Sequence, residues 1–99
     1  MKITEEKIKE LTNLGFSRWQ KGNMDRLYID ASQLGLVCTY YHTGNIRHAS
    51  IMGFDISNSE ARRMKSAKTF IDVNTGICHS NNDTLRNIAC KLANIEEGM

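Results

Sequence analysis

Apolar residues recur with the period of an α-helix in three stretches of the chain. The first stretch begins after Thr4, whose hydroxyl can cap a helix, and ends at Gly15. Its expected buried positions are Ile8, Leu11 and Leu14. The second stretch begins at Ser57 with a capping-box spacing to Glu60. The third is expected to be capped by Asn82 or Asp83, with its apolar face at Leu85, Ile88, Ala89, Leu92 and Ile95.

Between these stretches, residues with high β propensity occur in pairs around turn residues. Turns are expected at Gly22–Asn23, near Gly44–Asn45 and at 74–76, which predicts three hairpins. The segment 30–35 can form one helical turn, capped by Asp30 and Gln33. The pattern predicts a single α+β domain spanning residues 1–99. We expect an antiparallel sheet of about six short strands, built from β-hairpins with helices packed on it.

The charge is uneven along the chain. The net charge is only +2, but residues 18–68 hold eight basic and four acidic residues, a net of +4. The three cysteines form no regular framework, and the N-terminus has no apolar leader. We therefore expect reduced thiols and a location in the cytoplasm of a host cell. No apolar run has the roughly 20 residues of a membrane span, so no membrane partner is expected.

The segment "ISNSEARRMKSAK" (56–68) reads as an amphipathic helix. Arg62, Arg63 and Lys65 share its polar face, which contains no acid, so we expect nothing on this helix to neutralise them. Arginine forks bind phosphates and carboxylates in a bidentate manner. The sequence therefore predicts a partner surface here; the alternative is a charged face that only contacts water.

The first hairpin interleaves basic and aromatic residues. Its predicted partner- or nucleic-acid-binding residues are Arg18, Lys21 and Arg26, and Arg47 of the second hairpin joins them. Strand alternation places Arg26 and Tyr28 on one face and Leu27 and Ile29 on the other. A basic strand with an exposed ring could be a platform for stacking nucleobases. The alternative is that Trp19 and a tyrosine pack in the core or at its rim.

No constellation of residues specifies catalysis. His42 and His48 could serve acid–base chemistry, but no Ser, His and Asp arrangement accompanies them. Zinc binding by Cys38, His42, His48, Cys78 and His79 would need three or four ligands to converge, and the chain has no Cys-x-x-Cys pair. No glycine-rich phosphate loop precedes a helix. We expect a protein that is not an enzyme and has no cofactor or metal.

Four short motifs resemble proteins encoded by phages and prophages of Gram-positive bacteria. They read "WQKGNMDRLYI", "YYHTGNIRHA", "GFDISNSEARR" and "FIDVNTG", within residues 16–79. The resemblance implies a mobile-element setting, in which small proteins include anti-CRISPR inhibitors and other counter-defence proteins. Many anti-CRISPR proteins are acidic DNA mimics, whereas this chain has a sequence pI of about 8.5. The resemblance assigns no active residues.

Two functional hypotheses follow. The first is a non-enzymatic phage inhibitor that binds a bacterial defence protein such as a Cas effector, with or without its guide RNA. The second is a small phage regulator that binds DNA or RNA directly through its basic Arg and Lys face. A second copy of the chain is a further candidate partner. A third hypothesis, a small hydrolase or nuclease, requires turnover that depends on His42 or His48.

Overall fold

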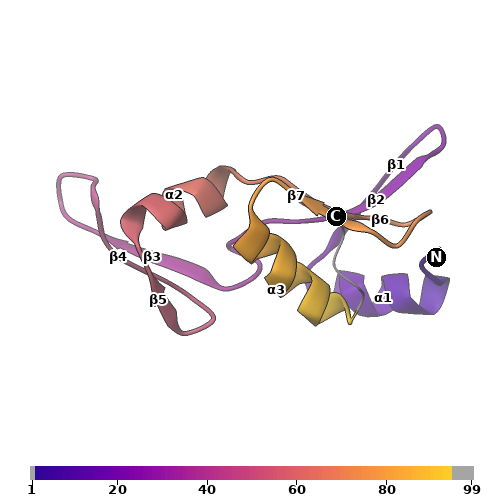
Figure 1. Ribbon diagram of the computed structural model, residues 1–99, viewed down its shortest axis with the longest axis horizontal. Coiled ribbons are helices and arrows are strands. Elements are labelled where there is room, and N and C mark those ends of the chain that lie inside the picture. Colours follow the sequence, from indigo (N-terminus) through magenta and orange to yellow (C-terminus); the bar gives the residue numbers. More distant parts are fainter. Residues whose placement is uncertain (1, 95–99) are drawn as a thin grey trace.

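The computed structural model describes residues 2–94 of the 99-residue chain. In chain order, the elements are α1 (Glu5–Asn13), β1 (Ser17–Lys21), β2 (Met24–Ile29), β3 (Leu36–Tyr40), β4 (Ile46–Ile51), β5 (Phe54–Ile56), α2 (Asn58–Ser66), β6 (Thr69–Asp72), β7 (Cys78–Ser80) and α3 (Asp83–Ala93). They form an elongated molecule of about 44 × 24 × 24 Å (Figure 1). The described residues contain no helix with the length and apolar character needed to cross a bilayer.

The strands form two antiparallel sheets, ordered β1-β2-β6-β7 and β3-β4-β5. This confirms the predicted α+β class built from hairpins. The expectation of one sheet with about six strands is wrong, because the seven strands found within residues 2–94 divide between two sheets. Strand β2 pairs with β6, with Ile29 opposite Thr69, rather than continuing into β3. The short β5 was not predicted as a strand.

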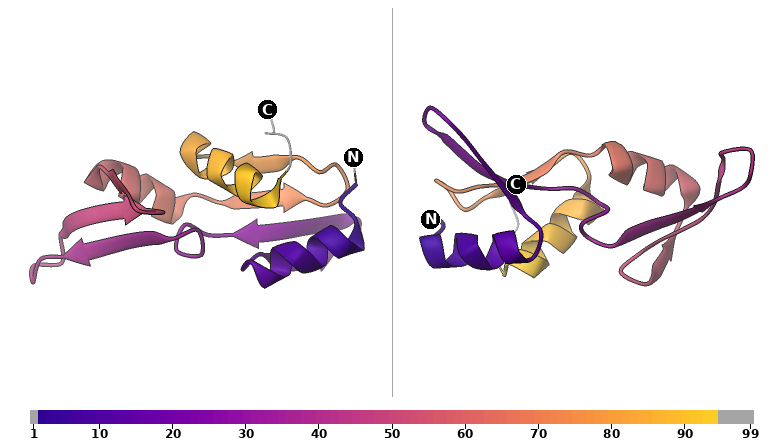
Figure 2. Two further views of the ribbon diagram at one scale, coloured as in Figure 1. Left: turned by 90° about the horizontal axis from the view of Figure 1, so that it is seen from below. Right: turned by 180° about the vertical axis from the view of Figure 1, so that it is seen from behind.

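Within residues 2–94, each sheet is covered by helices on one side only, and the covered sides of the two sheets face in opposite directions. In Figure 1, α1 and α3 lie below the four-stranded sheet, and α2 lies above the three-stranded one; Figure 2 shows the same layers from two further directions. The largest fully buried side chains include Leu11, Leu27, Met64, Ile71 and Leu85. They belong to one hydrophobic core that contains buried residues of both sheets and all three helices.

The predicted helix starts are confirmed. Thr4, Ser57 and Asn82 each accept a hydrogen bond from the backbone N–H three residues later. The predicted burial of Leu14 is wrong: it follows the last residue of α1 and is 53% exposed, whereas Phe16 is buried. In the last helix, the predicted Ile95 lies outside the described residues.

Two turns explain the remaining local differences. Asp30 and Gln33 cap each other reciprocally at 2.9 and 3.0 Å, but segment 30–35 makes only a hydrogen-bonded turn and no helix. Met52 and Gly53 both have positive φ, +51° and +83°, which matches a two-residue hairpin turn of type I′. The sequence indicated a turn at Met52–Gly53, and the structure confirms it; because methionine is rare in that conformation, the pattern did not indicate a tight hairpin and β5 was not predicted.

Candidate functional site

The face of the four-stranded sheet away from α1 and α3 carries one aromatic ring on each strand. Side chains alternate along a strand, so the buried Leu27 and Ile71 point toward the helices and their neighbours point away. The outward set contains Trp19, Arg26, Tyr28, Phe70 and His79, which we call the aromatic face. Tyr28 lies opposite Phe70, and Phe70 lies opposite His79. No helix of residues 2–94 covers this face (Figures 1 and 2).

The four rings form a continuous row across the sheet. Trp19 and Tyr28 meet edge to face with centroids 6.2 Å apart, and Tyr28 tilts against Phe70 at 5.3 Å. Phe70 and His79 stack at 5.0 Å with planes 24° apart. The inner rings of Tyr28 and Phe70 are half-buried, whereas the outer rings of Trp19 and His79 are exposed. The row therefore has free ring surface at both ends.

Arg26 lies among these rings as a cation without a carboxylate partner in the described chain. Its guanidinium carbon is 4.3 Å from the Phe70 centroid and 5.8 Å from that of Trp19. Its Nη1 donates to Tyr28 Oη at 3.0 Å, and its buried Nε has no hydrogen-bond partner among residues 2–94. Asp72 opposes Arg26 in the register, but its carboxylate accepts two backbone N–H groups of the β6–β7 turn. Arg26 is thus held rigidly and remains free to bind an anion.

An open hollow of about 390 Å³ lies at the β7 edge of this face. Its lining includes Lys68, Phe70, His79, Asn81 and Arg86. Arg86 donates from Nη2 to Asp83 at 2.8 Å, and its Nε is buried without a partner. The exposed Lys68 also borders a second hollow of about 300 Å³ beside Tyr28. Cations, rings and a side-chain amide therefore converge at this end of the aromatic face.

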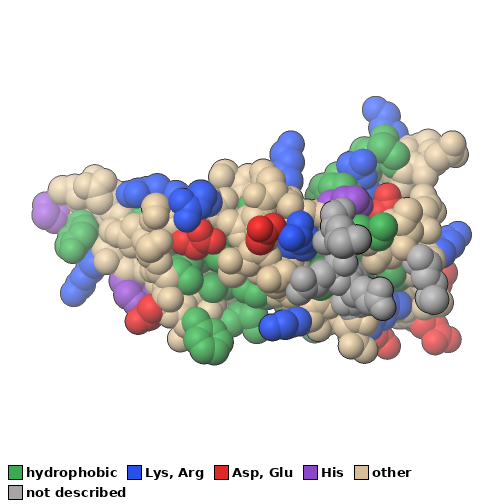
Figure 3. All heavy atoms as spheres, viewed as in Figure 1, with side chains coloured by type: hydrophobic (Ala, Val, Ile, Leu, Met, Phe, Trp, Pro, Cys, Tyr) green, Lys and Arg blue, Asp and Glu red, His purple; other side chains and the backbone are tan. Residues whose placement is uncertain are grey.

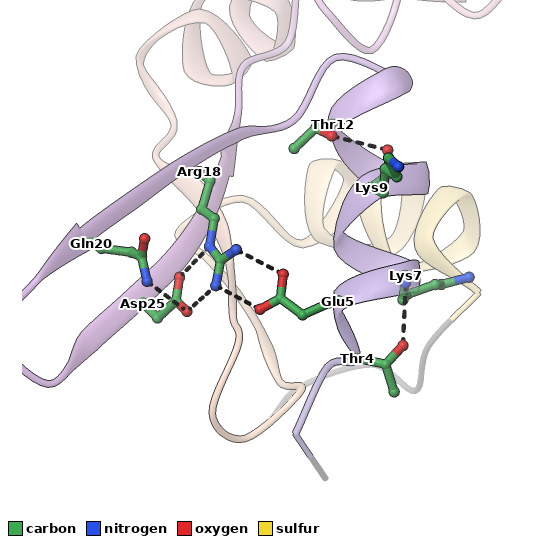
Figure 4. A network of polar contacts seen from close by, with 8 residues as sticks. All are labelled: Thr4, Glu5, Lys7, Lys9, Thr12, Arg18, Gln20 and Asp25. Atoms are coloured by element: carbon green, nitrogen blue, oxygen red, sulfur yellow. Dashed lines mark hydrogen bonds and ion pairs between the residues drawn. The ribbon is translucent and has the colours of Figure 1, made fainter.

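Arg18, by contrast, is engaged within the fold. It lies on the helix-covered face of the same sheet, where its guanidinium contacts Asp25 at 2.7 Å and Glu5 of α1 at 3.1 Å (Figure 4). The hydrogen bonds to Asp25 and Glu5 raise the pKa of Arg18, and the hydrogen bond from Arg18 lowers the pKa of Asp25. Arg18 thus ties α1 to the first hairpin and is not a free cation.

On α2, the predicted division of faces is correct, but one expectation about charge is wrong. Ala61 and Met64 are fully buried, while Arg62 and Arg63 are exposed. Glu60 accepts hydrogen bonds from Arg63 Nε and Nη2, so an acid of this helix does neutralise one arginine. Residues three apart are neighbours on a helix surface, which brings Glu60 to Arg63. Among residues 2–94, the Arg62 side chain has no hydrogen bond or ion pair.

The other predicted cations differ in their surroundings. Lys65 donates to Tyr40 Oη at 2.6 Å, and this hydrogen bond raises the Lys65 pKa. Lys21 shares the aromatic face, because β1 register places it two residues beyond Trp19, and it is exposed. Arg47 is exposed on the three-stranded sheet. The seven predicted residues therefore do not form one cluster.

The residues considered for catalysis or metal binding do not converge. His48 Nε2 lies 2.9 Å from Asp55 Oδ1 on the exposed side of the three-stranded sheet. His79 belongs to the ring row, and Cys78 is buried, which raises its pKa to about 12. Within residues 2–94, no three His, Cys, Asp or Glu side chains are placed to hold a metal ion.

Sequence reasoning missed Phe70 and His79 as members of the site. The alternation in "TFID" and "CHS" would have separated these rings from the buried Ile71 and Cys78. Their proximity to Arg26 depends on the pairing of β2 with β6, which the sequence pattern did not indicate. A comparison with protein-family models, curated proteins and solved structures gives no match.

Proposed function

We propose that the protein binds single-stranded nucleic acid on the aromatic face. The observation that carries the proposal is Arg26, a cation held among aromatic rings on an open sheet face with no carboxylate partner in the described chain. An arginine that only contacts water would gain little stability from being held in place among aromatic rings. In contrast, a phosphate can pair with the charge of Arg26, and the plane of a base can stack on its flat guanidinium.

The ring row suits bases rather than base pairs. Every nucleobase has a π-face, and stacking on an aromatic side chain is worth about 1–3 kcal/mol per base without strong sequence preference. The exposed rings at the two ends of the row, Trp19 and His79, are the surfaces on which bases would stack. The hollow lined by Lys68 and Arg86 would then receive phosphate or a base edge. A duplex hides its base faces and would bind more weakly.

The chain contains its own reporter for this binding. Trp19 is the only tryptophan and lies on the aromatic face, so stacking of a base should quench its fluorescence. Single-stranded DNA and RNA oligonucleotides would be titrated into the protein at two salt concentrations, with the matching duplexes in parallel. We expect quenching by single strands, with affinity that falls by about 0.7 log units per phosphate contact for each log unit of salt.

The matched variants are Arg26→Met and Arg47→Met. Both remove one arginine charge, but only Arg26 belongs to the aromatic face. Loss of a charged hydrogen bond of about 1.5–3 kcal/mol predicts weakening of roughly tenfold to hundredfold for Arg26→Met. Arg47→Met should bind nearly as the wild type. If no oligonucleotide quenches Trp19, or if both variants bind alike while remaining folded by circular dichroism, nucleic-acid binding by this face is refuted.

A second candidate is inhibition of a bacterial defence protein such as a Cas effector. It is supported by the resemblance to phage proteins and by Arg47 and Arg62, which are exposed on the other half of the molecule without an ion pair in the described chain. Acidic protein surface is a suitable partner for such arginines. The test is co-purification with Cas effectors followed by a cleavage assay. Absence of both binding and inhibition would remove this candidate.

We place either activity in the cytoplasm of a host cell. Cys38, Cys78 and Cys90 are free thiols in the structure. A reducing compartment would keep them so. Thiol labelling of protein that is denatured on isolation from expressing cells tests this point, because Cys78 and Cys90 are buried in the fold. Three free thiols are expected, and a disulfide would contradict the placement.

A further inference from the structure

Building on the proposed function, we infer that a bound strand continues from the aromatic face over Lys68 and along α2. One strand would then contact both halves of the molecule. The cations on this path are Lys21, Arg26, Lys68, Arg63 and Arg62, which we call the basic track. The ligand is single-stranded DNA or RNA long enough to follow it.

Lys68 connects the two halves of this path. Only Ala67 and Lys68 separate the end of α2 from the start of β6. Ala67 is buried, whereas Lys68 is exposed and borders both hollows, one beside His79 and one beside Tyr28. The aromatic face turns away from α1 and α3, and α2 lies on that same side of the molecule (Figure 1). A strand leaving the rings can therefore meet Lys68 and α2 without crossing to the other side.

The distribution of charge favours the same direction. In Figure 3, Lys and Arg side chains gather along the upper edge, over α2 and over the β1–β2 hairpin, and the acidic side chains over α2 and α3 lie below them. The acids nearest to the track already have partners: Glu60 binds Arg63, and Asp83 binds Arg86. The opposite side presents the exposed Glu5, Glu6 and Glu10 of α1. Of these, Glu5 binds Arg18 and Glu10 binds Lys7, so the two sides differ mainly in the basic side chains that gather along the upper edge and attract phosphates there.

The length of the molecule sets the length of the ligand. The long axis measures 44 Å, which is the upper limit for the length of the track. At about 3.4 Å per nucleotide for a stacked strand, some twelve nucleotides would cover that distance. A strand of about four nucleotides would cover the ring row alone.

The experiment compares oligonucleotides of about four and about twelve nucleotides, as DNA and as RNA, by quenching of Trp19. The test variant is Arg62→Gln with Arg63→Gln. Its matched control is Lys9→Gln with Lys91→Gln, which removes the same charge from exposed lysines of α1 and α3 on the other side of the sheet.

We expect the wild type to bind the longer strand at least about tenfold more tightly at roughly 0.1 M salt. Two further phosphate contacts, one from Arg62 and one from Arg63 in exchange for its exposed ion pair with Glu60, contribute a slope of about 1.4. The α2 variant should lose most of that gain and keep its affinity for the short strand, while the control should keep both. Equal affinity for the two lengths, or equal behaviour of variant and control, overturns the continuous track but leaves short-strand binding in place. Absence of quenching at every length overturns the proposed function itself.

Discussion

The two sheets have the same construction and different open faces. Each has one side covered by helices, with buried residues such as Ile71 in one sheet and Ala49 in the other. The uncovered side of the three-stranded sheet carries Val37, Thr39, His48, Ser50 and Asp55, which we call the polar face. The uncovered side of the four-stranded sheet carries four rings and Arg26.

The polar face differs from the aromatic face in composition. Small and polar side chains dominate there, and His48 and Asp55 are hydrogen-bonded to each other within the sheet. The aromatic face departs from that composition in both respects, since it exposes rings and contains an arginine without an acidic partner in the described chain. Exposed apolar surface beside unpaired charge commonly marks an interaction site. The difference therefore supports assigning function to the aromatic face.

The largest effect is expected from the core that both sheets share. Leu27 is fully buried, and Leu27→Ala should lower the free energy of unfolding by about 2–5 kcal/mol. Because the two sheets contribute to one core, denaturation followed by Trp19 fluorescence and by far-ultraviolet circular dichroism should give coincident transitions. An earlier transition for Trp19, which lies on the four-stranded sheet, would show that the two halves unfold separately.

A binding assay that compares variants of the two open faces tests the difference between them directly. The pair Trp19→Ala and His79→Ala removes both outer rings, and should weaken single-strand binding by at least about 2 kcal/mol, or thirtyfold. Because this variant lacks tryptophan, binding would be measured by anisotropy of a labelled oligonucleotide.

The matched control is Val37→Ala with His48→Ala on the polar face. These side chains are 58% and 53% exposed, so their loss should change binding less than twofold and stability little. Equal losses of affinity in the two double variants, both folded, would remove the functional distinction between the faces.

Arg18→Met tests whether the two arginines of the first hairpin differ in role. Loss of its hydrogen bonds to Asp25 and Glu5 should destabilise the protein by about 1–2 kcal/mol at neutral pH, with no change in nucleic-acid binding. The folded-state pKa of Asp25 is lowered, so its stabilising contribution is present above the unfolded value of about 3.9 and is lost as pH falls through the folded pKa. Thermal melts should therefore converge for the two proteins in acid. A constant difference from neutral pH to pH 2 would contradict the role of this ion pair.

The smallest effect concerns the β4–β5 turn of the three-stranded sheet. Met52 has φ +51°, so Met52→Asn should relieve a strain of about 1 kcal/mol and raise the melting temperature. Met52→Ala removes the side chain but keeps the unfavourable φ, and should give no such gain. Equal melting temperatures for the two variants would show that the turn stores no relevant strain.

Local features of the fold were predictable because they depend on neighbouring residues. Thr4, Ser57 and Asn82 cap their helices, and the alternation at Leu27 and Ile29 gave the buried face of β2. The division into two sheets was not predictable, because each hairpin pattern is compatible with several neighbours. Sequence spacing contains no information on which of two exposed strand edges will pair.

The site was predictable only where its residues are close to one another in the sequence. Arg26 and Trp19 stood out because they are close in sequence and interleave charge with rings. Phe70 and His79 join them only through the pairing of β2 with β6 and of β6 with β7. Arg18 differs from Arg26 because it lies on the other face of the sheet, where Asp25 and Glu5 of α1 bind it. The pairing of Arg63 with Glu60 is local, and closer attention to their three-residue spacing would have revealed it.

The pairing of Ile29 with Thr69 has a consequence for how the chain assembles. The chain leaves the four-stranded sheet after Ile29 and returns directly opposite, so residues 30–68 are one long excursion inside a strand pair. Closing a disordered loop of that length would cost about 3 kcal/mol of entropy. The local hairpins of the excursion can form first and bring its ends together, which predicts that Ile51→Val slows folding whereas Ile71→Val mainly speeds unfolding in stopped-flow measurements. The half of the molecule that contains the three-stranded sheet would then act as the nucleus on which the aromatic face is completed.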